Sequence, residues 1–348
     1  CSLFLFIQYS KYVLHTLSLI CNRIMANTLA YIKSPIKQEL EVFEDRFKGS
    51  VKSKVPLLDT IMNYIVKRKG KQLRPLLVLH CAKLFGEINE STYRGAALVE
   101  LLHTAPLVHD DVVDEANMRR GFFSINALWK NKIAVLVGDY LLSKGLLLSL
   151  KNKDFKSLEI LSTAVEQMSE GELLQMEKAR KLDITEEVYF DIITKKTASL
   201  LASCCGIGAH SNEVEEDVLK MVIEMGELLG IAFQIKDDLF DYGDNKVGKP
   251  TGIDIVEKKM TLPLIFALNN ADKGERRRII KIVKKDKKTK QQVQDVISFV
   301  KQKGGINYAQ EVMLDYKQRA EQLLNKLPTQ SSTEYLQALI DFVIERKK

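Results

Sequence analysis

Two acidic motifs hold the residues whose types and spacing could do chemistry. Both have the form D-D-x-x-D, and together they supply six carboxylates: Asp110, Asp111, Asp114, Asp237, Asp238 and Asp241. Residues four apart on a helix point the same way, so the first and last carboxylates of each motif lie one turn apart on one face. Such carboxylates repel each other unless a cation lies between them. Oxygen ligands without His or Cys are those that Mg²⁺ prefers, and Mg²⁺ takes further ligands from water and phosphate.

The setting of the two motifs favours metal binding over a solvated helix end. A single D-D-x-x-D motif is typical of an exposed helix terminus. Here each copy directly follows an apolar segment with helical periodicity, residues 96–108 in one case and residues 221–235 in the other. Several uncompensated carboxylates would be costly beside buried helices. The pair of motifs therefore predicts Mg²⁺-binding clusters.

Basic residues near both motifs predict a substrate that carries phosphate. Guanidinium groups suit bidentate contacts with phosphate oxygens, whereas an ammonium group acts as a point charge. Any one of these cations alone would be interpreted as surface charge, but in the sequence they group around both acidic motifs. The candidates are Lys71, Arg74, Arg119, Arg120, Lys196, Lys249, Lys258 and Lys259.

Several other kinds of site lack candidates in this sequence. There is no P-loop sequence, so nucleotide hydrolysis is not supported. There is no G-x-S-x-G motif and no Cys/His pair at a strand end, which leaves nucleophilic catalysis without a candidate. A di-iron helical bundle needs two Glu-x-x-His steps, and only Glu100 to His103 provides one.

The elements that must position these residues are predicted to be helices. Only 7 prolines occur, and none lies between Pro106 and Pro250. Because a proline inside a helix removes a hydrogen bond and clashes with the preceding turn, this interval can hold several long helices. Short β-branched runs between glycine-rich turns are absent, which argues against a sheet. The predicted fold class is all-α, with Pro106 kinking the helix one turn before the first motif.

The positive charge is concentrated in one stretch. The chain carries a formal net charge of +7, and residues 272–290 hold ten basic against three acidic residues. No aromatic residue interleaves them, which argues against nucleic acid as a partner. We interpret the stretch as a solvated helical hairpin far from the chemistry.

The N-terminal segment and the cysteines bear on domain organisation and compartment. Residues 1–24 are apolar and aromatic, but their uninterrupted runs are too short to span a bilayer. We expect them to be an extension outside a single catalytic domain of residues 25–348. The 5 cysteines show no paired spacing, and Cys204 and Cys205 lie in an apolar string. Reduced core thiols and a cytoplasmic protein are therefore predicted.

Five segments taken together are similar to the motifs of a known enzyme family. They are GKQLRP, LLHTAPLVHDDVVDEANMRRG, KTASL, GIAFQIKDDLFDY and GKPTGIDIVEKKMTLPL. In this order and spacing they resemble the trans-isoprenyl diphosphate synthases, in particular the long-chain polyprenyl synthases, from about residue 57 to the C-terminus. The resemblance implies a single-domain bundle of long helices around a central cavity, usually a homodimer. It also implies Mg²⁺-dependent condensation of isopentenyl diphosphate with an allylic diphosphate.

The resemblance further implies a role for each candidate residue. Asp110, Asp114 and Asp237 would contact Mg²⁺, of which three ions are expected with substrate bound, and Asp111, Asp238 and Asp241 would support them. Isopentenyl diphosphate would be held by Lys71, Arg74, His103 and Arg120. The allylic diphosphate would be held by Arg119, Lys196, Thr197, Gln234, Lys249 and Lys259. No protein base is required, because the proton released by condensation can pass to the departing diphosphate.

Product length is predicted from the residues that precede the first motif. Ala105 and Pro106 lie about one helical turn before Asp110 and carry no aromatic ring, so a growing chain could pass them. We expect a long-chain all-trans product, a quinone side-chain precursor, whose length is limited deeper, along residues 141–150. A transient membrane-surface contact for product release is also expected. The alternatives are a farnesyl or geranylgeranyl diphosphate synthase, a class I terpene cyclase, which would lack the second acidic motif, and a non-catalytic partner subunit.

Overall fold

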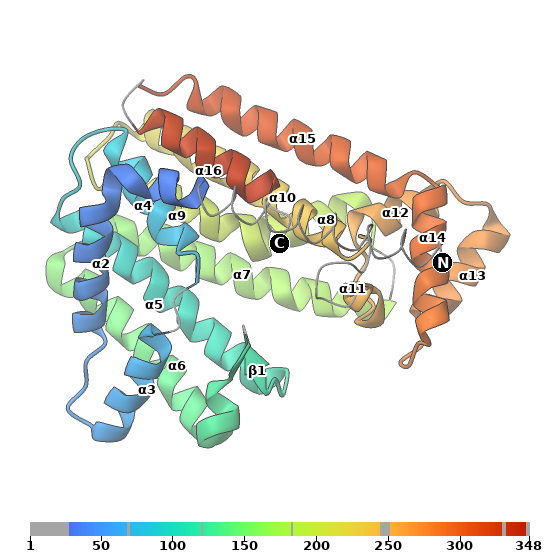
Figure 1. Cartoon of the computed structure of the whole chain (residues 1–348), viewed down its shortest axis with the longest axis horizontal. Helices are drawn as coiled ribbons and strands as arrows, with labels where there is room; N and C mark the ends of the chain where they lie inside the picture. The colour runs from blue at the N-terminus through green and yellow to red at the C-terminus, as the bar shows by residue number, and fades with distance from the viewer. Residues whose placement is uncertain are drawn as a thin grey trace, which may run out of the picture.

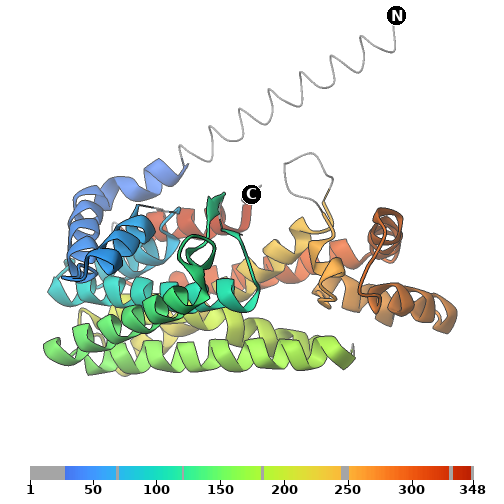
Figure 2. The same ribbon diagram turned by 90° about the horizontal axis from the view of Figure 1, so that it is seen from below.

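The computed structural model describes residues 28–67, 70–119, 121–181, 184–243, 251–328 and 332–345. The predicted boundary between an extension and the catalytic domain at residue 25 lies outside these ranges and stays a prediction. Figure 1 shows the described chain as long helices with one small β-hairpin. In the view turned by 90°, the helices stack in layers, with yellow-green helix at one face and the blue N-terminal helices at the opposite face (Figure 2).

Helices account for nearly all of the regular structure. They are η1 (Ser34–Ile36), α2 (Lys37–Ser50), α3 (Pro56–Val66), α4 (Leu73–Lys83), α5 (Glu90–Val113), α6 (Ile125–Asn152), α7 (Phe155–Lys181), α8 (Glu186–Ile193), η2 (Thr194–Ala198), α9 (Ser199–His210), α10 (Glu216–Phe240), α11 (Ile253–Val256), α12 (Leu262–Asn269), α13 (Lys273–Val283), α14 (Lys290–Gln302), α15 (Gly305–Leu324) and α16 (Thr333–Glu345). Within the described ranges the only strands are β1 (Met118–Arg119) and β2 (Phe122–Phe123), which pair antiparallel. The prediction of an all-α fold is confirmed.

Helix α9 lies at the centre of the core. It packs against α4, α7 and α10, and its side chains Leu200, Cys204, Cys205 and Ile207 are all buried although they project in different directions. A helix that is apolar all round has to be covered on every side. Cys204 and Cys205 are free buried thiols, as predicted, and so is Cys81 on α4.

Helix α5 carries the first acidic motif at its C-terminal end. Asn89 begins it, because its side chain accepts a hydrogen bond from the Thr92 backbone N–H while the Thr92 hydroxyl accepts one from the Asn89 N–H. The helix then continues through Pro106 to Val113. The proline therefore removes one hydrogen bond but does not interrupt the helix, and the predicted kink does not break the approach to Asp110.

Helix α6 covers α5 and exposes an apolar face. Its glycines let α5 approach: a Cβ added at Gly145 would lie 2.0 Å from Leu102 Cδ1. The prediction that residues 141–150 form core or cavity wall is only partly correct. Leu141 is buried, but Leu146, Leu147 and Leu150 are 43%, 48% and 49% exposed. By length and composition α6 could cross a membrane, although a third of its apolar window is buried against the rest of the molecule.

His80 joins both ends of the described chain to α4. Its Nε2 lies 2.9 Å from the Ile32 carbonyl oxygen, and its Nδ1 lies 2.8 Å from the Ser332 hydroxyl. A carbonyl oxygen only accepts, so Nε2 carries the proton and Nδ1 accepts from the hydroxyl. Burial lowers the pKa of His80 to about 4, which keeps the imidazole neutral in this contact.

The basic stretch at residues 272–290 forms a helical hairpin from α13 and α14, as predicted. Ile279 and Val283 are buried, whereas Arg277 and Lys281 project into solvent. The hairpin lies at one end of the molecule beside α11 (orange, right in Figure 1), and α14 packs against α11. Because α11 lies in the loop that lines an acidic cavity described below, the prediction that the hairpin is far from the candidate site is wrong.

Candidate active site

Two neighbouring cavities contain most of the predicted site residues. The acidic cavity, about 370 Å³, is lined by Lys196, Thr197, Gln234, Asp237, Asp238, Asp241 and Lys259, with residues of α7 and α8. The basic cavity, about 710 Å³, is lined by Lys71, Arg74, Asp111 and Arg119 together with aromatic side chains. The sequence thus predicted residues on both cavities from segments far apart in the chain.

Helix α10 delivers the second acidic motif to the acidic cavity. Asp238 is buried and accepts hydrogen bonds from Gln234 Nε2 at 2.8 Å and from the Tyr189 hydroxyl at 2.7 Å. Burial raises its pKa to about 7, and the charge of Asp254 adds to this in spite of the two hydrogen bonds. Burial and Asp254 likewise raise the pKa of Asp241 to about 6. The cavity therefore holds carboxylates whose negative charge is poorly compensated.

Close helix contacts bring Lys196 and Thr197 to the same cavity. Both lie in η2, a π-helical segment of the kind that often occurs at functional sites. A Cβ added at Gly171 on α7 would lie 2.9 Å from the Lys196 nitrogen, and one at Gly230 on α10 would lie 2.4 Å from Ala198 Cα. These glycines let α7 and α10 reach η2 from two sides.

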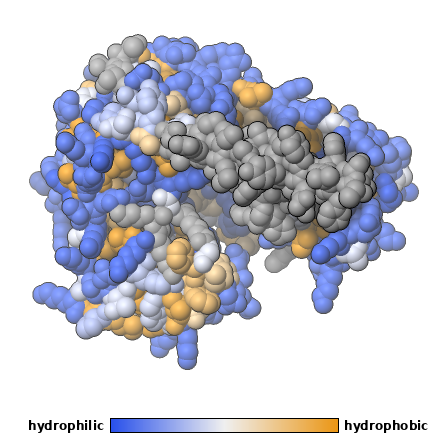
Figure 3. All heavy atoms as spheres, viewed as in Figure 1, coloured by the Kyte–Doolittle hydropathy of each residue, from blue (hydrophilic) through white to orange (hydrophobic). Residues whose placement is uncertain are grey.

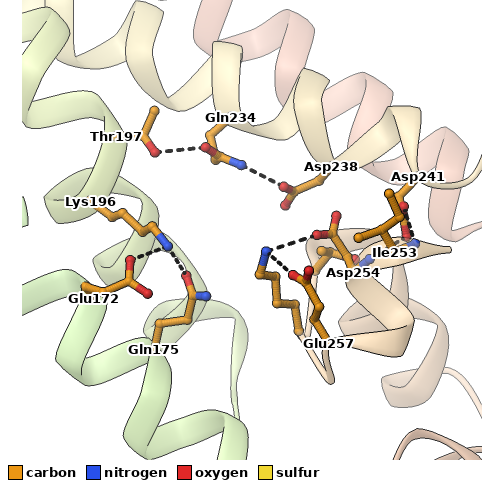
Figure 4. A network of polar contacts seen from close by, with 12 residues as sticks. Glu172, Gln175, Lys196, Thr197, Gln234, Asp238, Asp241, Ile253, Asp254 and Glu257 are labelled. Atoms are coloured by element: carbon orange, nitrogen blue, oxygen red, sulfur yellow. Dashed lines mark hydrogen bonds and ion pairs between the residues drawn. The ribbon is translucent and has the colours of Figure 1, made fainter. Parts of the chain in front are cut away.

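The polar side chains of this region form separate groups of hydrogen bonds and ion pairs (Figure 4). The Thr197 hydroxyl donates to Gln234 Oε1 at 2.8 Å, and the amide of Gln234 donates to Asp238. Lys196 forms an ion pair with Glu172 and donates to Gln175 Oε1 at 3.1 Å. Three of the residues that accept these hydrogen bonds line the acidic cavity: Gln175, Gln234 and Asp238.

The first acidic motif also lies within electrostatic range of Lys196. Desolvation by the surrounding protein raises the pKa of Asp110, and the negative charges of Glu172 and Asp114 raise it further. The positive charge of Lys196 lowers it. Lys196 and Glu172 thus interact electrostatically with the end of α5, and Lys196 also lines the acidic cavity. Asp111 is buried and pairs with Arg119, Nε to Oδ1, at 2.7 Å.

The cations of the basic cavity are held by specific partners. Arg74 Nε lies 2.8 Å from Glu100 Oε1. Glu100 of the Glu-x-x-His step is therefore paired with an arginine. The Lys71 ammonium lies 5.2 Å from the centre of the Phe342 ring. His103 is half-buried on α5, but among the described residues it does not line either cavity. Its predicted role stays a prediction.

Two predicted residues, Arg120 and Lys249, lie outside the described residues. Lys259 is half-buried, 2.7 Å from Glu257 Oε2 and 3.4 Å from Asp254 Oδ1. His109, which directly precedes Asp110, contacts α6, with Nε2 3.2 Å from the Val135 carbonyl oxygen.

The sequence interpretation missed several side chains that line or support the site. Asp254 belongs to the GKPTGIDIVEKKMTLPL segment, so its acidity beside Lys259 was a usable signal. The others give no local signal, because their partners are distant in sequence; they are Glu172, Gln175, Tyr189 and Glu100.

The donor chemistry of the two motifs fits Mg²⁺. Within the described ranges no three His, Cys, Asp or Glu side chains converge to form a complete metal-binding group. Mg²⁺ is commonly bound by one or two carboxylates and takes its other ligands from water and substrate phosphates. Buried carboxylates with raised pKa values, such as Asp238 and Asp241, favour a nearby cation.

Comparison with known proteins gives consistent matches. The family model described as polyprenyl synthetase matches residues 55–300. A geranylgeranyl diphosphate synthase of Saccharolobus solfataricus is 35% identical over 314 residues, which cover 87% of this chain and 94% of the relative. The structure of a decaprenyl diphosphate synthase from Rhodobacter capsulatus superposes with a TM-score of 0.86 at 34% identity, covering 92% of this chain and 99% of that one.

A second solved structure shows the ligand chemistry of a similar protein. The polyprenyl synthase of Caulobacter crescentus, in complex with calcium and isoprenyl diphosphate, superposes with a TM-score of 0.83 at 30% identity, covering 92% of this chain and 98% of that one. With the helical fold and both acidic motifs in place, the chain belongs to the polyprenyl synthetase family, a family of Mg²⁺-dependent trans-prenyltransferases that make prenyl diphosphates.

Proposed function

We propose that this enzyme condenses isopentenyl diphosphate with an allylic diphosphate to make a long-chain all-trans polyprenyl diphosphate, a quinone side-chain precursor. The observation that carries the proposal is the position of Lys196, which lines the acidic cavity of the second motif and also interacts with Asp110 of the first. A cation between two carboxylate clusters is suited to a diphosphate held by metal ions. The calcium and isoprenyl diphosphate in the Caulobacter crescentus protein support this.

We assign the allylic diphosphate to the acidic cavity. Asp110, Asp114 and Asp237 would hold Mg²⁺, three ions in the substrate complex, with Asp111, Asp238 and Asp241 in support. When bound, Mg²⁺ supplies Lewis-acid stabilisation of the diphosphate leaving group. Lys196, Thr197, Gln234 and Lys259, which line this cavity, would contact the diphosphate directly. Arg119 would reach it from the neighbouring basic cavity, and the role of Lys249 rests on the sequence resemblance alone.

We assign isopentenyl diphosphate to the basic cavity, where Lys71 and Arg74 would hold it. The roles of His103 and Arg120 at the same substrate rest on the sequence resemblance alone. Its double bond then attacks the allylic carbon as the carbon–oxygen bond to diphosphate breaks. Apolar lining such as Leu107 and Phe233 would exclude water from the cationic carbon. The attack leaves a positive charge on the isopentenyl unit, an adjacent carbon loses a proton to form the new double bond, and the departing diphosphate takes that proton, so the chain needs no dedicated base.

Product length is the finer part of the proposal. The similar proteins named above include a geranylgeranyl and a decaprenyl diphosphate synthase, so family membership is compatible with both short and long products. Ala105 is fully buried on α5, about one helical turn before the first motif. It does not itself line the basic cavity, whereas its neighbours Thr104 and Leu107 do. A methyl group there leaves more room for a growing chain than an aromatic ring, which supports a long product over a farnesyl or geranylgeranyl product.

We propose that the enzyme is a homodimer formed through α6. The support is the row of exposed leucines at positions 146, 147 and 150, because exposed apolar patches of this kind mark interaction sites. Figure 3 shows apolar side chains over the lower part of the molecule, where α6 lies. Leu147→Glu should yield a monomer in light scattering, whereas the control Leu314→Glu, at a 52% exposed position on α15, should not. A dimeric Leu147→Glu variant would contradict this interface.

We also propose that the α13–α14 hairpin makes a transient contact with anionic membrane surfaces during product release. A second proposal is that the protein is cytoplasmic. The exposed cations of the hairpin and the reduced buried thiols support these two statements. Sedimentation with phosphatidylglycerol vesicles, but not with phosphatidylcholine vesicles, is the expected result. Equal sedimentation with both would contradict an electrostatic contact, and preferential binding to RNA would favour nucleic acid instead.

The direct test of the main proposal is a product assay. Purified enzyme is incubated with Mg²⁺, labelled isopentenyl diphosphate and each of three primers, geranyl, farnesyl and geranylgeranyl diphosphate, and the products are sized by mass spectrometry. Products well beyond geranylgeranyl length are expected. Products that stop at farnesyl or geranylgeranyl length would support the shorter-chain alternative, and a cyclised hydrocarbon would support a terpene cyclase.

A further inference from the structure

The loop at residues 251–261 forms one wall of the acidic cavity. Its backbone is attached to the second acidic motif, because the N–H groups of Ile253 and Asp254 donate to the two carboxylate oxygens of Asp241 at 2.8 and 3.1 Å. The same loop presents Asp254 and Lys259 to the cavity. The position of the loop therefore decides where the Lys259 ammonium lies.

The opposite side of this loop rests on the α13–α14 hairpin. Gly252 has φ +82°, and a Cβ added there would lie 2.1 Å from Val293 Cγ1 on α14, so the loop backbone packs directly against that helix. Lys288 Nζ donates to the Val256 carbonyl oxygen at 3.2 Å. The hairpin thus supports the loop by packing and by a hydrogen bond.

Two neighbouring lysines of the loop contact different parts of the molecule, one the acidic cavity and the other the α13–α14 hairpin. Lys259 directs its ammonium to Asp254 and Glu257 at the cavity. Lys258 has φ +61°, a left-handed conformation that a residue with a Cβ rarely adopts, and its Nζ lies 2.5 Å from Asp286 Oδ1 in the hairpin. The unusual backbone conformation at Lys258 is therefore accompanied by a specific contact outside the loop.

We infer that Asp286 is a positioning residue for the allylic diphosphate site. By holding Lys258 it fixes the loop in the position from which Lys259 faces the cavity. Asp286 itself lies outside the cavity, so it acts only through the loop. This inference rests on the proposed assignment of Lys259 to the allylic diphosphate.

The test is the effect of Asp286→Asn on the two substrates. The Lys258–Asp286 pair is largely solvent-exposed on the Asp286 side, and pairs of this kind contribute little, so the KM for the allylic diphosphate should rise roughly two- to fivefold. The KM for isopentenyl diphosphate and kcat should change less than that. Asp295→Asn is the matched control, because it removes a carboxylate from α14 that pairs only locally, with Gln291.

A double-mutant comparison and a salt titration separate positioning from general damage. Lys258→Met with Asp286→Asn should raise the allylic KM no more than Lys258→Met alone, because the two side chains act as one unit. The ratio of the Asp286→Asn and wild-type KM values should approach one in about 1 M KCl, where the Debye length is about 3 Å.

Three results would overturn the inference. They are an Asp286→Asn variant that behaves like Asp295→Asn, equal increases in both KM values, and an effect that persists at high salt. Calorimetric titration with inorganic diphosphate and Mg²⁺ provides a readout that does not need turnover, and Asp286→Asn should weaken that binding by the same factor. A wild-type protein that binds diphosphate but transfers no prenyl group would refute the proposed function, while the calorimetric ratio would still decide the role of Asp286.

Discussion

Asp238→Asn should make the substrate-free enzyme more stable while it removes activity. The Asp238 carboxyl is buried, and its pKa rises from 3.8 to about 7. A carboxyl group with a raised folded-state pKa binds protons more tightly in the folded state, so the free energy of unfolding falls as pH rises from about 4 to about 7. A rise of this size in the pKa corresponds to about 4 kcal/mol in the free energy of unfolding. At pH 8 the full penalty is present, and the neutral amide removes it.

The amide can be accommodated without loss of the surrounding hydrogen bonds. The Tyr189 hydroxyl can still donate to the Asn oxygen, and Gln234 can turn its amide so that its oxygen accepts from the new NH₂ group while its nitrogen donates to Thr197. The variant therefore exchanges a poorly compensated charge for a neutral group of the same shape.

The assay is thermal and urea unfolding of the metal-free protein at pH 8 and pH 5. The gain should be about 4 kcal/mol at pH 8 and about 2 kcal/mol or less at pH 5, where folded Asp238 is already protonated. Since a domain of 150–250 residues shifts by roughly 2–4 °C per kcal/mol, Tm should rise by several degrees at pH 8. Asp315→Asn, an exposed change on α15, should be neutral. A variant no more stable than this control at pH 8, or equally stabilised at both pH values, would refute the reasoning.

Other perturbations have equally specific outcomes. Removal of divalent metal with EDTA should abolish turnover, and Asp110→Ala or Asp237→Ala should lower kcat by several orders of magnitude with unchanged circular dichroism; near-normal turnover in EDTA would contradict the metal assignment. Lys71→Gln should raise the KM for isopentenyl diphosphate more than that for the primer, because a lost ground-state contact is seen in KM; equal effects would contradict the two-cavity assignment. Ala105→Phe should shorten the product to about farnesyl or geranylgeranyl length by mass spectrometry, and an unchanged product would place the growing chain elsewhere. His80 alone should lower the free energy of unfolding by about 3 kcal/mol between pH 6.5 and pH 4, because it is protonated more readily in the unfolded chain, and this contribution opposes that of Asp238; in urea titrations His80→Gln should make the protein more stable at pH 4, relative to pH 6.5, than the wild type is.

The helical fold and the acidic motifs could be predicted because their signals are local. An apolar segment with helical period followed by D-D-x-x-D predicts both a buried helix and the position of its carboxylates, as α5 and α10 demonstrate. The lack of proline between Pro106 and Pro250 allowed long helices, and the structure has them.

The side chains that hold these groups in place could not be predicted in the same way. Glu172 meets Lys196 because Gly171 lets α7 approach a π-helical segment, and nothing in the sequence around Glu172 specifies that packing. The solvent face of α6 was misjudged for a related reason, since an apolar helix buried in a core and one with an exposed apolar face have similar compositions. Likewise, charge alone could not reveal that the basic hairpin touches the loop of Asp254.

The chain of hydrogen bonds from Thr197 to Asp238 has a direction. The Thr197 hydroxyl donates its single hydrogen bond to Gln234 Oε1, and Gln234 Nε2 in turn donates a hydrogen bond to Asp238. If a diphosphate oxygen accepted the hydrogen bond of the Thr197 hydroxyl, Gln234 Oε1 would lose its donor. The NH₂ group of the same amide would still face the Asp238 carboxylate. The Gln234 amide would therefore couple ligand binding at Thr197 to the charge state of Asp238. If the diphosphate binds at Thr197 as proposed, its binding and the protonation of Asp238 are linked equilibria, in which a change at either residue alters the affinity at the other.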